Sequence, residues 1–125
     1  MINVLVVDDS KSVHAFVRDC IAGTKISLTH VMNGQLALDE LAKNTTPIQL
    51  ILLDWEMPVL DGEKTFSEIK KRSLNIPVVM MTSRNSLEDL TNMIGAGVSE
   101  YIMKPFTKDI LIAKIESVLG STLGS

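Results

Sequence analysis

Three aspartates directly follow largely apolar runs in this sequence. Asp8 and Asp9 end the run over residues 3–7, and Asp54 ends the run over residues 50–53. Such runs indicate strands that are buried on both faces of a sheet. In open parallel sheets ligands bind outside the carboxyl ends of the strands, so the three carboxylates should meet there. They would repel one another and raise at least one pKa unless a cation neutralised them.

A hard divalent cation would relieve this repulsion. Magnesium prefers carboxylate oxygens together with retained water, and these motifs contain no histidine or thiolate that would favour zinc. The sequence therefore predicts a Mg²⁺ site at Asp8, Asp9 and Asp54. A lone aspartate after a strand would more often cap the next turn, so the prediction depends on its companions.

Two further strands would bring a hydroxyl and an ammonium group to the same edge of the sheet. The run over residues 76–81 ends in Thr82, and the run over residues 101–103 ends in Lys104, which precedes Pro105. Without this context Lys104 would be interpreted as a surface lysine. A cis Lys104–Pro105 peptide would direct the ammonium group inward, and X–Pro bonds permit the cis form at about 0.5–1 kcal/mol. We therefore expect a cis peptide bond here.

Helical patterns separate the strands. After Ser10, a good N-cap, a first apolar stripe appears at helical spacing and is formed by Val13, Phe16, Val17, Cys20 and Ile21. Cys20 is expected to be a buried apolar side chain. His14 lies off the stripe, and its distance from His30 matches no metal-ligand spacing. Both histidines are therefore expected to be solvated or partly packed.

The remaining segments complete an alternating pattern. Residues 26–32 alternate in polarity like a half-exposed edge strand, and further helices are expected after Gly34, Gly62, Ser86 and Thr107. Five strands that alternate with five helices imply a parallel sheet covered on both faces, because parallel connections need long crossovers.

Taken in order, these motifs resemble the response-regulator receiver domain of two-component signalling systems. The resemblance runs from Asn3 to about Leu119, and its motifs are Asp8-Asp9, Asp54-x-x-Met57-Pro58-x-x-Asp61-Gly62, Thr82-Ser83, and Ala96-Gly97 followed by Tyr101-x-x-Lys104-Pro105-Phe106. It implies an α/β, flavodoxin-like fold: a doubly wound five-stranded parallel sheet with strand order 2-1-3-4-5 and five helices. It also implies a receiver domain over residues 1–119 and a tail or linker stub over residues 120–125. A tryptophan directly after Asp54, here Trp55, resembles the pattern of the chemotaxis branch of the family.

The resemblance implies a role for each acidic residue. Asp54 would be the phosphoacceptor. Asp9 and Asp54 would bind Mg²⁺ directly together with the backbone carbonyl of Glu56, and Asp8 would act mainly through water.

Phosphoryl transfer needs a nucleophile in line and positive charge around the phosphoryl oxygens. Asp54 can attack the phosphorus, Lys104 can neutralise an oxygen of the aspartyl phosphate, and Thr82 supplies a hydroxyl donor. If the family's switch applies, Thr82 moves inward and Tyr101 fills the space that it leaves. The surface of the fourth helix, fifth strand and fifth helix would then change. Otherwise Tyr101 is an ordinary strand aromatic.

Glu56 and Arg84 occupy positions at which the family varies. Both would flank the water that hydrolyses the aspartyl phosphate, so we expect them to tune its lifetime, in a direction that the sequence does not give. The Glu56 carboxylate could also reach toward the metal or pair with Lys104.

The sequence thus predicts a phosphorylation-activated signalling switch, a phosphoprotein of the chemotaxis or phosphorelay type. A sensor histidine kinase or phosphotransfer protein would phosphorylate Asp54, and the switch would control a downstream protein or an effector domain beyond this sequence. It would catalyse its own phosphorylation and dephosphorylation without being a metabolic enzyme, since five short strand–helix units leave no room for a substrate-enclosing cap. A phosphate-independent, receiver-like interaction scaffold is the alternative. The presence of Asp8, Asp9, Asp54, Thr82 and Lys104 together argues against it.

Composition limits the other functional classes. The 125 residues are 46% hydrophobic, which suits one packed domain, and the net charge of −3 gives no footprint for nucleic acid. A single cysteine cannot form an intramolecular disulfide, and no charged leader with a long apolar core precedes the first strand. No apolar run approaches the ~18 residues of a membrane span. We therefore expect a cytoplasmic protein without membrane or nucleic-acid partners.

Overall fold

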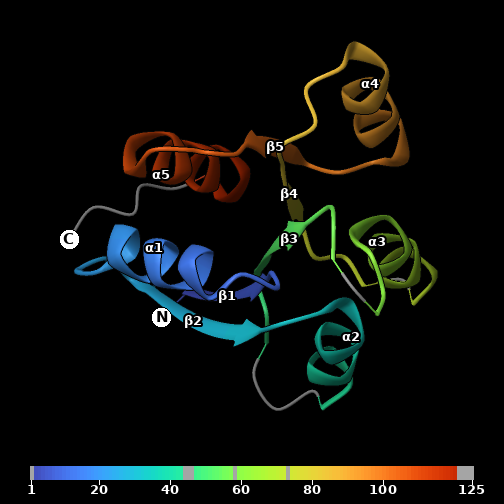
Figure 1. The fold of residues 1–125 in the computed structure, drawn as a ribbon. Coiled ribbons are helices and arrows are strands. Elements are labelled where there is room, and N and C mark those ends of the chain that lie inside the picture. The colour runs from blue at the N-terminus through green and yellow to red at the C-terminus, as the bar shows by residue number, and fades with distance from the viewer. Residues whose placement is uncertain (1, 44–46, 58, 73, 121–125) are drawn as a thin grey trace.

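A five-stranded parallel sheet forms the centre of the computed structural model, which describes residues 2–43, 47–57, 59–72 and 74–120. The strands are β1 (Ile2–Val7), β2 (Ile26–Val31), β3 (Leu50–Asp54), β4 (Val78–Thr82) and β5 (Glu100–Met103). Their order is β2-β1-β3-β4-β5, so the predicted strand order and the predicted edge position of the second strand are confirmed (Figure 1).

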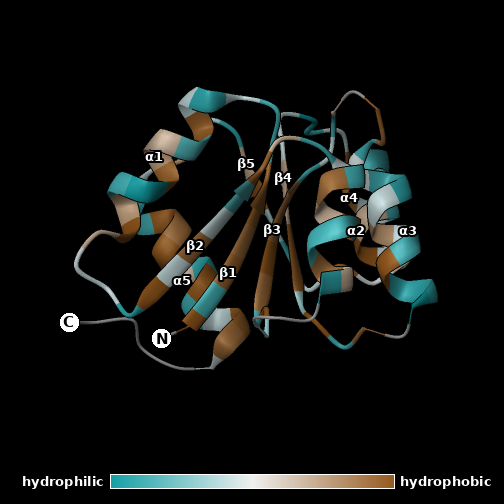
Figure 2. Cartoon of the chain, turned by 90° about the horizontal axis from the view of Figure 1, so that it is seen from below, coloured by the Kyte–Doolittle hydropathy of each residue, from teal (hydrophilic) through white to brown (hydrophobic). Residues whose placement is uncertain are grey.

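Five helices alternate with the strands. They are α1 (Lys11–Ile21), α2 (Gly34–Lys43), α3 (Gly62–Lys71), α4 (Leu87–Ala96) and α5 (Lys108–Leu119). Helices α1 and α5 cover one face of the sheet, and α2, α3 and α4 cover the other (Figure 1). The hydrophobic residues concentrate in the strands between these two layers (Figure 2). The doubly wound, flavodoxin-like α/β fold is therefore confirmed.

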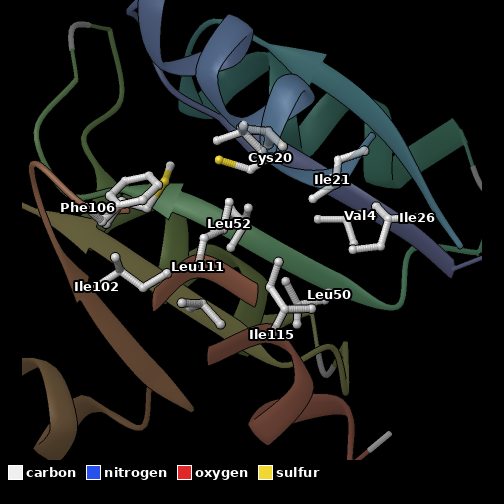
Figure 3. Close-up of a cluster of buried hydrophobic side chains, with 14 residues drawn as sticks. Val4, Cys20, Ile21, Ile26, Leu50, Leu52, Ile102, Phe106, Leu111 and Ile115 are labelled. Atoms are coloured by element: carbon white, nitrogen blue, oxygen red, sulfur yellow. The ribbon is translucent and has the colours of Figure 1, made fainter. Parts of the chain in front are cut away.

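Two apolar cores flank the sheet, because alternate residues of a strand point to opposite faces. In β3, Leu50 and Leu52 pack in the core beneath α1 and α5 (Figure 3), whereas Ile51 and Leu53 pack in the core beneath α2 and α3. All four side chains are fully buried. This double burial explains why the run before Asp54 is continuously apolar.

The predicted buried stripe of α1 differs from the structure at two positions: one predicted residue is exposed, and one residue outside the stripe is buried. Phe16 is 41% exposed, whereas His14, outside the predicted stripe, is buried. Both ring nitrogens of His14 have hydrogen-bonding partners, on His30 and Asp8. A polar side chain can be buried when its polar atoms are paired. The expectation that the histidines are solvated or partly packed is therefore wrong for His14.

Side-chain caps start most of the helices near the carboxyl edge of the sheet. The N-caps are Ser10 for α1, Asp61 for α3, Ser86 for α4 and Thr107 for α5. Helix α5 ends at Gly120, whose φ of 71° lies in the left-handed region that favours glycine. The rest of the predicted tail, residues 121–125, lies outside the described residues. No helix in the described ranges is both long and apolar enough to cross a membrane.

Helix α4 packs against the sheet through little of its surface. Met93 is the buried residue of this helix, whereas Leu87 is 81% exposed and Ile94 is 49% exposed. At its C-terminal end, Lys70 of α3 donates a hydrogen bond of 2.6 Å to the carbonyl of Ala96. Helix α4 is thus held in part by polar contacts and presents apolar side chains outward.

Candidate functional site

Asp8, Asp9 and Asp54 meet at the carboxyl ends of β1 and β3. One carboxylate oxygen from each residue lies within 4.8 Å of the others. Strands β1 and β3 are neighbours with Val7 opposite Leu53, so Asp8 and Asp54 follow at the same level of the sheet. Asp8 is fully buried, Asp54 is 5% exposed and Asp9 is exposed. The structure therefore brings the three predicted residues together.

The chemistry of this donor set fits Mg²⁺. Three carboxylates form the cluster within the described ranges, and neither histidine nor cysteine belongs to it. Oxygen donors suit a hard cation, and because Asp9 is exposed, water would reach an ion held by these carboxylates. The assignment of Asp8, Asp9, Asp54 and the Glu56 carbonyl as ligands stays a prediction.

Lys104 binds both buried aspartates. Its Nζ atom donates hydrogen bonds to Asp8 Oδ2 at 2.8 Å and to Asp54 Oδ1 at 3.0 Å. The Lys104–Pro105 peptide bond is cis, as predicted. The alternative pairing of Lys104 with Glu56 is not found, since the Glu56 carboxylate binds Arg84.

The site holds more negative charge than Lys104 compensates. Burial, followed by the negative charge of Asp8, raises the pKa of Asp54 from 3.8 to about 6, although the hydrogen bond from Lys104 acts in the opposite direction. Burial also disfavours the charged form of Lys104, but the hydrogen bonds to Asp8 and Asp54, together with the negative charges of these two residues, outweigh it and raise the pKa of Lys104 above 10.5. Lys104 is therefore an ammonium ion at neutral pH, and a divalent cation would relieve the repulsion that remains.

Thr82 lies at the end of β4, the next strand in the sheet. Met81 is paired with Asp54 in the β3–β4 register, and Thr82 follows it with only 1% of its surface exposed. Its Oγ1 atom accepts a hydrogen bond of 2.9 Å from the backbone N–H of Arg84. A hydroxyl that accepts can still donate its own hydrogen, so Thr82 has the chemistry of the predicted donor.

Glu56 and Arg84 form an ion pair across the loops that follow β3 and β4. The Arg84 Nε atom lies 3.0 Å from Glu56 Oε1, and both side chains are about half exposed. Arg84 also approaches Asp89 in the first turn of α4 at 3.8 Å. The two positions predicted to tune the phosphoryl lifetime are thus paired with each other, although the tuning stays a prediction.

Tyr101 is half-buried in β5, on the sheet face that α4 covers. The Nζ atom of Lys114 lies 5.4 Å from the centre of its ring, a cation–π geometry. Thr82 and Met103 are paired across β4 and β5, which places Tyr101 two residues before the partner of Thr82. The gating role of Tyr101 stays a prediction.

An apolar groove of about 440 Å³ opens beside Lys104. Its lining includes Phe16 of α1 and Pro105 and Phe106 of the loop after β5. The rings of Phe16 and Phe106 form a T-shaped pair with centroids 5.6 Å apart. Phe16 therefore contributes to a surface next to the acidic cluster, which explains why it is exposed within the predicted stripe.

Two residues near the site were missed in the sequence: His14, which contacts Asp8, and His30, which contacts His14. The Nε2 atom of His14 lies 2.8 Å from the backbone oxygen of Asp8, and its Nδ1 atom lies 2.7 Å from Nδ1 of His30. Burial, followed by the charges of His14 and Arg18, holds the pKa of His30 below 6.5. The sequence places His14 only 6 residues after Asp8, which was the available signal, whereas the pairing of His30 with Val6 near the end of β1 comes from the structure alone.

Comparisons with known proteins agree on one kind of domain. A family model for the response regulator receiver domain matches residues 4–116. The chemotaxis protein CheY homolog of Campylobacter jejuni is 31% identical over 125 residues, covering 96% of this chain and 94% of that protein. The sensor histidine kinase CheAY of Helicobacter pylori is 33% identical over 115 residues, covering 90% of this chain and 14% of that protein. Among solved structures, a Francisella response regulator 1452 receiver domain has a TM-score of 0.86 and 30% identity, covering 96% of this chain and 98% of that chain.

Proposed function

Since this chain belongs to the response regulator receiver domain family, we propose that it is a phosphorylation-activated switch that accepts a phosphoryl group on Asp54. The main observation in support of this proposal is the environment of the Asp54 carboxylate. Asp54 is buried beside Asp8 and receives a hydrogen bond of 3.0 Å from Lys104. A nucleophile, a cation that stabilises charge and further carboxylates for a metal are therefore together at one end of the sheet.

The proposed reaction transfers a phosphoryl group from a phosphohistidine to Asp54. A carboxylate oxygen of Asp54 attacks the phosphorus, the P–N bond to the donor imidazole breaks, and the imidazole keeps the bonding electrons and takes up a proton. Lys104 moves its hydrogen bond from the carboxylate to a phosphoryl oxygen, and the Thr82 hydroxyl donates to another. Bound Mg²⁺ would neutralise the phosphoryl oxygens and shield the carboxylates from their own repulsion. Hydrolysis returns the carboxylate, and we expect Glu56 and Arg84 to set its rate.

The donor in this scheme is a sensor histidine kinase or phosphotransfer protein. The apolar groove lined by Phe16, Pro105 and Phe106 gives such a protein a surface to contact beside Lys104. The H. pylori relative, CheAY, is itself a sensor histidine kinase by name, which supports this class of partner. The cytoplasmic location expected from the sequence remains a prediction.

The output surface in this proposal is α4, β5 and α5. Helix α4 exposes Leu87 and Ile94 and buries Met93, so a downstream protein could cover apolar area there. A helix with few buried contacts can also shift at a small cost in free energy. Tyr101 lies on the adjacent strand, so an inward movement of Thr82 would change the space available to the Tyr101 side chain. We further propose that the receiver domain ends with α5 at Leu119.

Trp55 fluorescence tests this function directly, because the indole follows Asp54 and is the chain's single tryptophan. The protein is titrated with Mg²⁺ and then with a small acyl phosphate, beside an Asp54→Asn control. We expect a Mg²⁺-dependent change, followed by a reversible change that the control lacks. Mg²⁺ binding without any phosphate response, even from a phosphorylated donor protein, would contradict the switch and favour the phosphate-independent scaffold.

A further inference from the structure

A chain of hydrogen bonds runs from the edge strand to the acidic cluster. The Nδ1 atoms of His30 and His14 are 2.7 Å apart, and His14 Nε2 is 2.8 Å from the backbone oxygen of Asp8. A carbonyl oxygen only accepts, so His14 Nε2 must carry a hydrogen. In neutral rings, His14 Nδ1 then has a lone pair, and His30 Nδ1–H donates to it. The chain therefore has a defined direction, from β2 through α1 to the end of β1.

Each polar group of Asp8 is bound by a different neighbour. Its N–H donates to the Val31 carbonyl at 3.2 Å, and its two carboxylate oxygens accept from the Ser10 N–H at 2.9 Å and from Lys104 Nζ at 2.8 Å. The carbonyl is the remaining group, and His14 satisfies it. Asp8 is fully buried, so loss of this donor would leave a buried acceptor without a partner. The peptide unit would then tend to turn toward another donor.

That peptide unit joins two of the predicted metal ligands. Its carbonyl belongs to Asp8 and its N–H to Asp9, so its orientation fixes the backbone from which both side chains project. A pattern of this kind, in which a neighbour orients a ligand without touching the metal, commonly affects the affinity of metal sites. Here the orienting bond acts on the backbone of the ligands and comes from a histidine in the following helix.

We propose that His14 is a positioning residue for the Mg²⁺ site and that His30 holds His14 in the tautomer with hydrogen on Nε2. This role rests on the proposed function, in which Asp8 and Asp9 bind Mg²⁺. Loss of a partner that orients a metal ligand typically weakens affinity by about 10–100-fold. His14 acts through the backbone, so we expect the lower end, about a tenfold weaker Mg²⁺ affinity.

The first test compares two substitutions at the same position. His14→Gln offers an amide N–H near the place of Nε2, whereas His14→Leu fills similar space without a donor. Mg²⁺ affinity is measured by Trp55 fluorescence on metal-free protein, with circular dichroism as the check on folding. We expect about a tenfold loss for His14→Leu and recovery of most of it in His14→Gln. Equal losses in both variants, or no loss in His14→Leu, would overturn the role.

The second test uses the wild-type rings and needs no folded His14 variant. Long-range ¹H–¹⁵N spectra report which ring nitrogen carries the hydrogen. We expect hydrogen on Nε2 of His14 and on Nδ1 of His30, and the opposite assignment at either ring would contradict the direction of the chain. His30→Ala should weaken Mg²⁺ binding, whereas Ser27→Ala, an exposed position on the same strand, should not. Unchanged affinity in His30→Ala would exclude a role for His30.

The outcomes separate this role from the proposed function. Wild-type protein that binds Mg²⁺ but never accepts a phosphoryl group would contradict the switch and leave the role of His14 intact. Wild-type protein that is phosphorylated, together with a His14→Leu variant of unchanged Mg²⁺ affinity, would contradict the role of His14 alone.

Discussion

Replacing Asp54 by asparagine should stabilise the metal-free protein at neutral pH, although it removes the phosphoacceptor. Burial and the charge of Asp8 raise the pKa of Asp54 to about 6, which means that the folded protein disfavours the ionised carboxylate. An asparagine keeps nearly the same shape, carries no charge and can still accept a hydrogen bond from Lys104. The substitution therefore removes an electrostatic cost without opening a cavity.

The size of the expected gain in the free energy of unfolding follows from the pKa shift of Asp54. The pKa rises from 3.8 to about 6, and each unit corresponds to about 1.4 kcal/mol, so ionised Asp54 costs the fold up to about 3 kcal/mol. Below pH ~4 the carboxyl is protonated in both the folded and unfolded states, and the cost is absent. Between about pH 4 and pH 6 the folded state binds more protons than the unfolded state, so stability falls as the pH rises. Above this window the cost is complete.

Urea denaturation followed by Trp55 fluorescence measures this difference in EDTA at several pH values. We expect Asp54→Asn to match the wild type near the acidic end and to become more stable by up to about 3 kcal/mol at pH 7–8. Asp19→Asn, at an exposed aspartate of α1, is the control and should change stability little at any pH. At a Mg²⁺ concentration 100-fold above its Kd, the wild type should gain about 2.7 kcal/mol that the variant lacks.

An Asp54→Asn variant that is less stable than the wild type at pH 7–8 in EDTA would refute this reasoning. It would mean that the two hydrogen bonds of Lys104 outweigh burial and repulsion. A stability difference that does not change between pH 4 and pH 7 would refute it as well, because the effect could not then arise from ionisation of Asp54.

Four further substitutions test the fold around the site and its ion pairs. Gly62→Ala should destabilise the fold by about 1–3 kcal/mol in urea denaturation, because the added Cβ would overlap the carbonyl oxygen of Asp54. Gly95→Ala, in open space within α4, should instead stabilise the fold by about 0.5–1 kcal/mol. Lys104→Met should raise the pKa of Asp54 further, and an NMR titration that shows a lower pKa would contradict the observed hydrogen bond. Glu56→Gln breaks an exposed ion pair and should change stability by less than about 1 kcal/mol, yet it should alter the decay rate of the aspartyl phosphate; an unchanged rate would exclude a tuning role.

The strand ends were predictable from the sequence because buried parallel strands have a simple pattern. Continuous apolar runs end at Asp8, Asp54, Thr82 and Lys104, and each of these polar residues lies at the same edge of the sheet in the structure. The order of the strands in the sheet could not be predicted in the same way, because no local sequence pattern encodes it. It followed from the resemblance to a family, as did the assignment of roles.

The burial of His14 could not be predicted, because periodicity locates apolar residues only. Its burial depends on a partner 16 residues away, His30, and on a backbone carbonyl at the end of another strand. The pair of Glu56 and Arg84 is likewise a contact between loops, 28 residues apart in sequence. Such contacts depend on the register of neighbouring strands, which the sequence alone does not specify.

The exposed face of α4 shows a third limit. Leu87, Leu90, Met93 and Ile94 have helical spacing typical of a buried stripe. In the structure Met93 is buried, and Leu87 and Ile94 remain exposed. Apolar periodicity does not distinguish a face that packs on the chain's own sheet from one that is available to another protein.

Intact-mass spectrometry after incubation with a small acyl phosphate and Mg²⁺ tests the central claim most directly. We expect a mass increase of one phosphoryl group that EDTA prevents, that reverses on removal of the donor, and that Asp54→Asn lacks. Peptide mapping should place the group on Asp54. Phosphorylation that persists in Asp54→Asn, or a wild-type protein that binds Mg²⁺ and gains no phosphoryl group from either an acyl phosphate or a phosphohistidine donor, would contradict the claim that Asp54 is the phosphoacceptor of a signalling switch.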